Sequence, residues 1–138
     1  MLICIDGILT TAEAGTFLRQ LQQSPWEDGA KTAGAVAKFA KHNQQVDESS
    51  PLAVSLGNQI LRRLGSHPQF LSAALPAKIH PPRFNRYDVG ESYGTHVDGA
   101  LMRMPGTHAS LRTDLSATLF LSAPGDYDGG ELQIEGPS

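Results

Sequence analysis

Apolar residues recur at helical spacing near the start of the chain. Phe17, Leu18 and Leu21 form one stripe, and Thr10 with Glu13 three residues later forms a capping box. The pattern predicts a helix from Thr11 to Gln23, which Ser24-Pro25 ends.

A second helical pattern begins at Ser50-Pro51, where serine is a good cap and proline suits the first helical position. Apolar residues follow at helical spacing until Gly65 closes the helix: Leu52, Leu56, Ile60, Leu61 and Leu64. A short helical turn is expected over Pro68 to Ala74.

The pattern changes to alternation after the helices. It predicts strands over Lys78 to Tyr87, Ser92 to Asp98, Thr113 to Ser122 and Glu131 to Glu135. The apolar segment Met1 to Ile5 fits a further, buried strand. The region from Trp26 to the second helix, interrupted by glycines and polar residues, is interpreted as strands and loops. Helices first and strands second indicate the α+β class.

Composition narrows the function classes. The chain has 138 residues, 40% of them hydrophobic, so one domain is expected. Its formal net charge of -3 predicts no cationic surface that would bind nucleic acid or anionic lipid. Cys4 is the sole cysteine, which excludes an internal disulfide and favours a reducing, cytoplasmic location. No segment approaches the roughly 20 apolar residues of a membrane span.

Two metal-ligand residue types stand together in Tyr93-Gly94-Thr95-His96-Val97-Asp98-Gly99. Residues i and i+2 of a strand share a face, so His96 and Asp98 can reach one ion. Such a pair is two-thirds of the 2-His-1-carboxylate triad of non-haem Fe(II) oxygenases. The alternative is that His96 is a surface histidine beside a turn and that Asp98 is an Asx-type turn residue before Gly99. Tyr87, on the preceding strand, could face the same pocket, and the place of Tyr93 is left open.

Several longer motifs resemble one family. The segments Phe84-Asn85-Arg86-Tyr87, Tyr93 to Gly99, Arg112 to Ser122 and Tyr127-Asp128-Gly129-Gly130-Glu131-Leu132 closely resemble bacterial PKHD-type hydroxylases, as does the upstream Asn43-Gln44-Gln45-Val46-Asp47. These are Fe(II)- and 2-oxoglutarate-dependent dioxygenases related to prolyl 4-hydroxylases. The resemblance covers nearly the whole chain.

The resemblance implies a fold and a chemistry. The fold would be a double-stranded β-helix, or jelly-roll, with residues 1–75 as a helical and mixed region packed on it and residues 76–138 as its first part. His96 and Asp98 would be iron ligands, and Tyr87 would help to hold 2-oxoglutarate. The reaction would use Fe(II), 2-oxoglutarate and O2, with L-ascorbate as a further cofactor, to hydroxylate a substrate that the sequence does not identify.

The chain also departs from the family pattern. The resemblance implies a distal histidine as the third iron ligand and, after it, an arginine that binds the cosubstrate. The histidine that follows Asp98 is His108, which lies only ten residues on in a Met/Pro/Gly loop and is not assigned as that ligand. The jelly-roll would therefore be incomplete at the C-terminus. We expect a partial or truncated sequence that by itself forms no succinate from 2-oxoglutarate.

Other candidates are interpreted structurally. Arg112 and Asp114 flank Thr113 on one face and could form an ion pair, and Gly129-Gly130 fits a tight turn. The remaining histidines are expected to be solvated side chains: His42, His67, His80 and His108.

Two further function classes stay open. One is a catalytically silent β-rich module that keeps half of the fold for binding other proteins. The other is a His/Asp metallohydrolase, against which the lack of a further histidine cluster counts.

Overall fold

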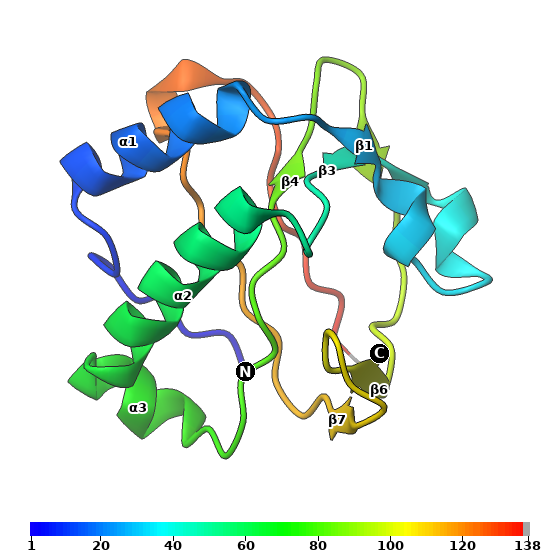
Figure 1. Ribbon diagram of the computed structural model, residues 1–138. Helices are drawn as coiled ribbons and strands as arrows, with labels where there is room; N and C mark the ends of the chain where they lie inside the picture. The colour runs from blue at the N-terminus through cyan, green and yellow to red at the C-terminus, as the bar shows by residue number, and fades with distance from the viewer. Residues whose placement is uncertain (137–138) are drawn as a thin grey trace.

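The computed structural model describes residues 1–136 and consists of helices and very short strands (Figure 1). The α-helices α1 (Thr11–Gln22), α2 (Pro51–Gly65) and α3 (Pro68–Ala74) gather on one side of the molecule, and most strands lie toward the other. The strands are β1 (Glu27–Asp28), β2 (Lys41–His42), β3 (Gln44–Gln45), β4 (Asn85–Arg86), β5 (Ser92–Tyr93), β6 (Leu101–Arg103) and β7 (Ser110–Arg112). The 3-10 helices are η1 (Gly29–Thr32), η2 (Ala37–Phe39) and η3 (Pro124–Asp126).

All three predicted helices are present, because their start signals are local. The Thr10 hydroxyl accepts a hydrogen bond from the Glu13 N–H at 3.1 Å, and the Glu13 carboxylate accepts one from the Thr10 N–H at 3.0 Å. Ser50 caps α2 through the Ala53 N–H, with Pro51 at the first helical position. His67 caps α3 by accepting from the Phe70 N–H through Nδ1.

The core lies between α1, α2 and two buried residues outside the helices and strands, Val46 and Phe84. The buried apolar side chains are Phe17 and Leu21 of α1, Ala53, Leu56 and Ile60 of α2, and Val46 and Phe84. Leu121 packs against this cluster from the C-terminal part of the chain. The predicted apolar stripes therefore face the core, and the hydrophobic effect holds α1 against α2.

The strands form three small antiparallel sheets, in the orders β1-β3-β4, β2-β5 and β6-β7. The mixed α+β class is thus confirmed, whereas the jelly-roll core stays a prediction.

Most predicted strands are wrong in extent. Of Lys78 to Tyr87 only Asn85–Arg86 is paired, and of Ser92 to Asp98 only Ser92–Tyr93. The segments Met1 to Ile5, Thr113 to Ser122 and Glu131 to Glu135 contain no strand. The physical reason is that alternation fits an extended chain, but a strand exists only where a second segment supplies backbone hydrogen bonds.

The first segment is also not buried, since Leu2 and Ile3 are exposed. Conversely, the β6–β7 hairpin was not predicted. It pairs Leu101 with Arg112 across the Met/Pro/Gly loop, and Gly106 in that loop takes a positive φ of 71°.

Candidate functional site

The backbone before the His-x-Asp pair is fixed by the β2–β5 ladder. Lys41 pairs with Tyr93 and His42 with Ser92. Beyond the ladder, the Gly94 N–H donates to the Ala40 carbonyl at 2.8 Å. A Cβ at Gly94 would lie 3.3 Å from the Ala40 Cβ, so glycine permits this close approach.

After Gly94 the chain leaves the ladder and bends at Thr95. His96 and Asp98 therefore lie on a segment without regular secondary structure and not on the predicted strand. Their side chains nevertheless converge, because the Asp98 Oδ1 atom is 3.2 Å from the His96 Nε2 atom.

The His96 ring is oriented by its own neighbourhood. The Nδ1 atom lies 2.7 Å from the Gly94 carbonyl oxygen, which only accepts hydrogen bonds, so we assign the ring proton to Nδ1. The Nε2 lone pair then faces the Asp98 carboxylate. A metal ion between these two acceptors would satisfy both of them.

The donor set fits a metal ion. Donor atoms about 2.1 Å from one octahedral ion are about 3.0 Å apart when adjacent, and the His96 Nε2 to Asp98 Oδ1 distance is 3.2 Å. A metal-bound imidazole usually donates its other N–H to a carbonyl or carboxylate, as His96 does toward Gly94. The assignment of these residues as metal ligands stays a prediction.

Tyr93 covers one face of the His96 ring. The two rings are stacked, with centroids 3.6 Å apart and planes inclined by 8°. Strict alternation would place residues 93 and 96 on opposite faces, and the bend at Thr95 brings them together. Burial is the main cause that raises the pKa of the Tyr93 phenol. The charge of Asp98, and to a smaller extent that of Tyr87, raises this pKa further.

Tyr87 follows β4 directly and is about half exposed, at 49%. It lies close enough to Tyr93 to raise the pKa of that phenol. The loop that joins β4 to β5 is tied to β3, because the Gln44 amide donates to Asp88 at 2.7 Å and to Glu91 at 2.8 Å. The role of Tyr87 in holding a cosubstrate stays a prediction.

The remaining histidines have other surroundings. His67 caps α3, and His80 lies within hydrogen-bond distance of the Pro81 and Arg103 carbonyls, so these two are more than the solvated side chains we expected. His42 and His108 are exposed. Within residues 1–136, no three His, Cys, Asp or Glu side chains gather in an arrangement that could hold a metal.

The predicted Arg112–Asp114 ion pair is present, with Nε and Oδ1 2.7 Å apart on an exposed surface. Gly129 and Gly130 take positive φ angles of 74° and 73° after a bend at Asp128, but no strand flanks them among the described residues, so the expected tight turn between strands is not formed.

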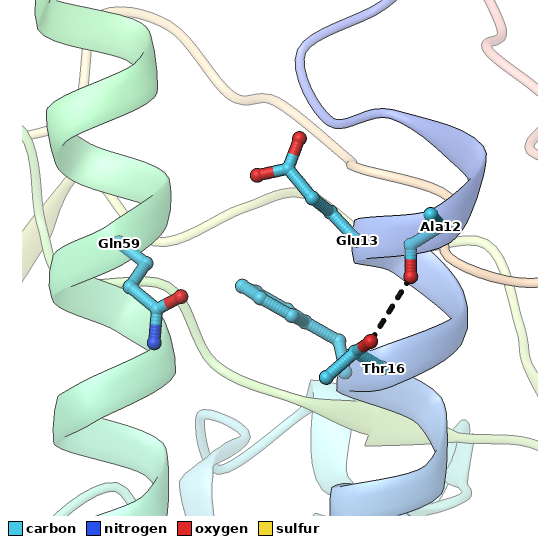
Figure 2. Close-up of a pocket in the computed structure, with 5 residues that line it drawn as sticks. Ala12, Glu13, Thr16 and Gln59 are labelled. Carbon is cyan, nitrogen blue, oxygen red and sulfur yellow. Dashed lines mark hydrogen bonds between the residues drawn. The ribbon is translucent and has the colours of Figure 1, made fainter.

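The surface hollows lie elsewhere. One is between α1 and α2, lined by Ala12, Glu13, Thr16, Phe17 and Gln59 (Figure 2). A second is formed by residues between Phe120 and Glu131. Neither lining contains His96 or Asp98.

Among the described residues, no helix has the length and apolar character to span a membrane.

One residue beside the pair was missed by the sequence reasoning. Lys41 is buried, and its ammonium nitrogen lies 5.4 Å from the Tyr93 ring centroid. A polar stretch around His42 to Gln45 gave no sign that Lys41 would be buried or that it would face Tyr93. Only the β2–β5 register reveals this contact.

Comparison with known proteins gives a consistent set of relatives. A PKHD-type hydroxylase of Acidovorax ebreus is 58% identical over 137 residues, which is 99% of this chain and 60% of that protein. PKHD-type hydroxylases of Pseudoalteromonas atlantica and Teredinibacter turnerae are 52% and 55% identical over 98% of this chain. The chain spans about 60% of the length of these curated relatives. No family model matches it.

Proposed function

Because the chain belongs to the PKHD-type hydroxylase family by its similarity to these relatives, we propose that it contributes to a hydroxylase that uses Fe(II), 2-oxoglutarate and O2. The hydroxylase name is shared by the relatives, and the iron and cosubstrate chemistry is our inference. Bound Fe(II) would supply the site at which O2 is activated, and O2 would be the oxidant both for decarboxylation of 2-oxoglutarate to succinate and carbon dioxide and for hydroxylation of a substrate. A jelly-roll core, with L-ascorbate as an additional cofactor and a cytoplasmic location, belongs to the same proposal.

The observation that carries this proposal is the geometry of His96 and Asp98. Their facing donor atoms, 3.2 Å apart, lie at the distance of adjacent ligands of one ion. The Gly94 carbonyl holds the Nδ1 proton and so leaves Nε2 free to bind the metal. Tyr87, whose charge acts on the Tyr93 phenol beside His96, would help to hold the cosubstrate.

The pair supplies two of the three ligands of a facial triad. We therefore expect the 138-residue chain by itself to bind Fe(II) without forming succinate from 2-oxoglutarate, even with ascorbate present. Robust succinate formation would contradict this part of the proposal.

An anaerobic titration with Fe(II) tests the metal site. The parent chain is compared with His96→Ala and, as a matched control, with His42→Ala. The control removes an exposed imidazole from β2, at the position that pairs with Ser92. We expect weaker binding for His96→Ala alone. Equal affinity of all three proteins would overturn the assignment of His96.

The second candidate function is a catalytically silent interaction module. It is favoured by apolar side chains of the C-terminal segment that are exposed on the described residues: Leu115, Phe120, Leu132 and Ile134. The titration separates the two functions, because a module has no need of a metal at His96.

A further inference from the structure

We propose that Lys41 and Tyr93 form a stacked column that orients the His96 ring toward Asp98, which makes both of them positioning residues of the site. The inference rests on the proposed function, since it concerns how a ligand of that site is held. The column is defined as the Lys41 ammonium, the Tyr93 ring and the His96 ring, in that order.

Two contacts build the column. The Lys41 nitrogen lies 5.4 Å from the Tyr93 ring centroid, within the roughly 6 Å over which a cation is attracted to a ring face. On Tyr93 the His96 ring is stacked at 3.6 Å, nearly parallel. The β2–β5 ladder supports both contacts, because Lys41 and Tyr93 are direct cross-strand partners.

Lys41 is held in place from its other side. Its ammonium donates to the Thr32 hydroxyl at 3.0 Å, and that hydroxyl donates to the Gln45 amide oxygen at 2.7 Å. Within residues 1–136, no carboxylate forms an ion pair with Lys41. Burial lowers the pKa of Lys41 more than the positive charge of Arg83 does. Desolvation of the ammonium therefore costs free energy, and the attraction to the Tyr93 ring offsets part of that cost.

The column and the Gly94 carbonyl restrain His96 in complementary ways. The stack with Tyr93 fixes the plane of the imidazole, and the contact of Nδ1 with Gly94 at 2.7 Å selects one of its two flipped orientations. Together they aim Nε2 at Asp98, where a metal ion would bind. The His96 side chain is accordingly only 24% exposed, although the segment that carries it has no strand partner.

The competing explanation is that Lys41 only supports the fold through Thr32 and Gln45. Conservative variants separate the two explanations. Tyr93→Phe keeps the ring and loses the hydroxyl, whereas Tyr93→Leu loses the ring. Lys41→Arg keeps a cation that stacks well on aromatic rings, whereas Lys41→Met keeps a comparable length without the charge.

The first measurement uses NMR on the metal-free 138-residue chain. Ring proton shifts of His96 report the stack with Tyr93, and long-range proton–nitrogen correlations report whether Nδ1 or Nε2 carries the proton. We expect Tyr93→Leu and Lys41→Met to weaken the stacking shift, with Tyr93→Phe and Lys41→Arg close to the parent. Unchanged His96 signals in both Tyr93→Leu and Lys41→Met would overturn the column.

The second measurement is anaerobic titration of the same variants with Fe(II) alone. We expect the dissociation constant to rise about tenfold for Tyr93→Leu and about threefold for Lys41→Met, with recovery in Lys41→Arg. Failure of Lys41→Arg to recover affinity would favour the purely structural explanation and overturn the role of Lys41.

The two measurements distinguish the inference from the proposed function. A chain in which His96 is stacked but Fe(II) does not bind refutes the metal site and leaves the column standing. A chain that binds Fe(II) equally well in all four variants refutes the column and leaves the site standing. Amide spectra establish first that each variant is folded, and if Lys41→Met does not fold, the Tyr93 pair of variants decides.

Discussion

The His96 Nε2 atom lies 3.2 Å from the Asp98 Oδ1 atom although neither residue belongs to a strand. The chain bends at Thr95 after the β2–β5 ladder ends, and the two donors still converge within three residues of chain. The strand ladder that ends at Tyr93 then sets where on the molecule this pair stands.

Removal of the Asp98 charge is expected to weaken metal binding. Asp98→Asn keeps the shape of the side chain but replaces an anionic ligand with a neutral one, so the affinity for Fe(II) in an anaerobic titration should fall by more than about tenfold. Asp114→Asn is the matched control, because both aspartate side chains are 65% exposed and the Asp114 carboxylate pairs with Arg112. A similar loss of affinity in the two variants would mean that general surface charge, and not Asp98, attracts the ion.

Truncation of Leu56 is expected to destabilise the fold. This side chain is 1% exposed at the centre of the α1–α2 core, so Leu56→Ala should lower the free energy of unfolding by about 3 kcal/mol in a urea titration. Val54→Ala on the same helix alters a side chain that is about half exposed and should change the value by less than about 0.5 kcal/mol. Equal effects would show that α2 does not pack as described.

A methyl group at Gly29 is expected to be poorly tolerated. Its Cβ would lie 1.7 Å from the Asn43 Oδ1 atom and 3.2 Å from the Asn43 carbonyl oxygen, and the Gly29 N–H already donates to that carbonyl. Since Asn43 is buried, the neighbouring atoms have little room to move, and Gly29→Ala should cost about 2 kcal/mol of unfolding free energy.

Gly34→Ala is the control for that substitution, because a Cβ at Gly34 meets no atom within 4 Å. Thermal unfolding of the two variants gives the comparison. A Gly29→Ala protein as stable as Gly34→Ala would contradict the close contact between Gly29 and Asn43.

The Asp47 carboxylate is expected to make stability depend on acid pH. It accepts hydrogen bonds from the Ser49 N–H at 2.9 Å and from the Ser49 hydroxyl at 2.8 Å, which hold the pKa of Asp47 below its ordinary value of 3.8. An acid whose pKa is lower in the folded state stabilises the fold above the unfolded pKa. That contribution is lost as the pH falls through the folded pKa.

Urea unfolding at a series of acid pH values tests this dependence. The stability difference between the parent and Asp47→Asn should be constant above about pH 5, shrink as the pH falls below that range and vanish once Asp47 is protonated in both states. Ser49→Ala keeps the backbone donor and should show a smaller effect of the same sign. A difference that does not change with pH would exclude Asp47 as its cause.

Local signals along the chain are enough to predict the helices and the candidate pair. Thr10 with Glu13, and Ser50 with Pro51, are start signals that act within one helical turn, and the apolar stripes that follow them face the core as predicted. His96 and Asp98 were identified in the same way, because the geometry that brings them together spans only three residues.

Features that depend on partners far apart along the chain follow from the folded arrangement alone. Alternation over Thr113 to Ser122 does not reveal whether a neighbouring segment pairs with it, and among the described residues no strand forms there, although the Thr113 N–H donates to the Ala100 carbonyl beside the β6–β7 hairpin. The stack of Tyr93 on His96 needs the bend at Thr95, and the place of Lys41 beneath Tyr93 needs the β2–β5 register. Lys41 and Tyr93 are 52 positions apart, so no local pattern specifies their contact, and only the folded chain places Lys41 beside the metal-binding candidates.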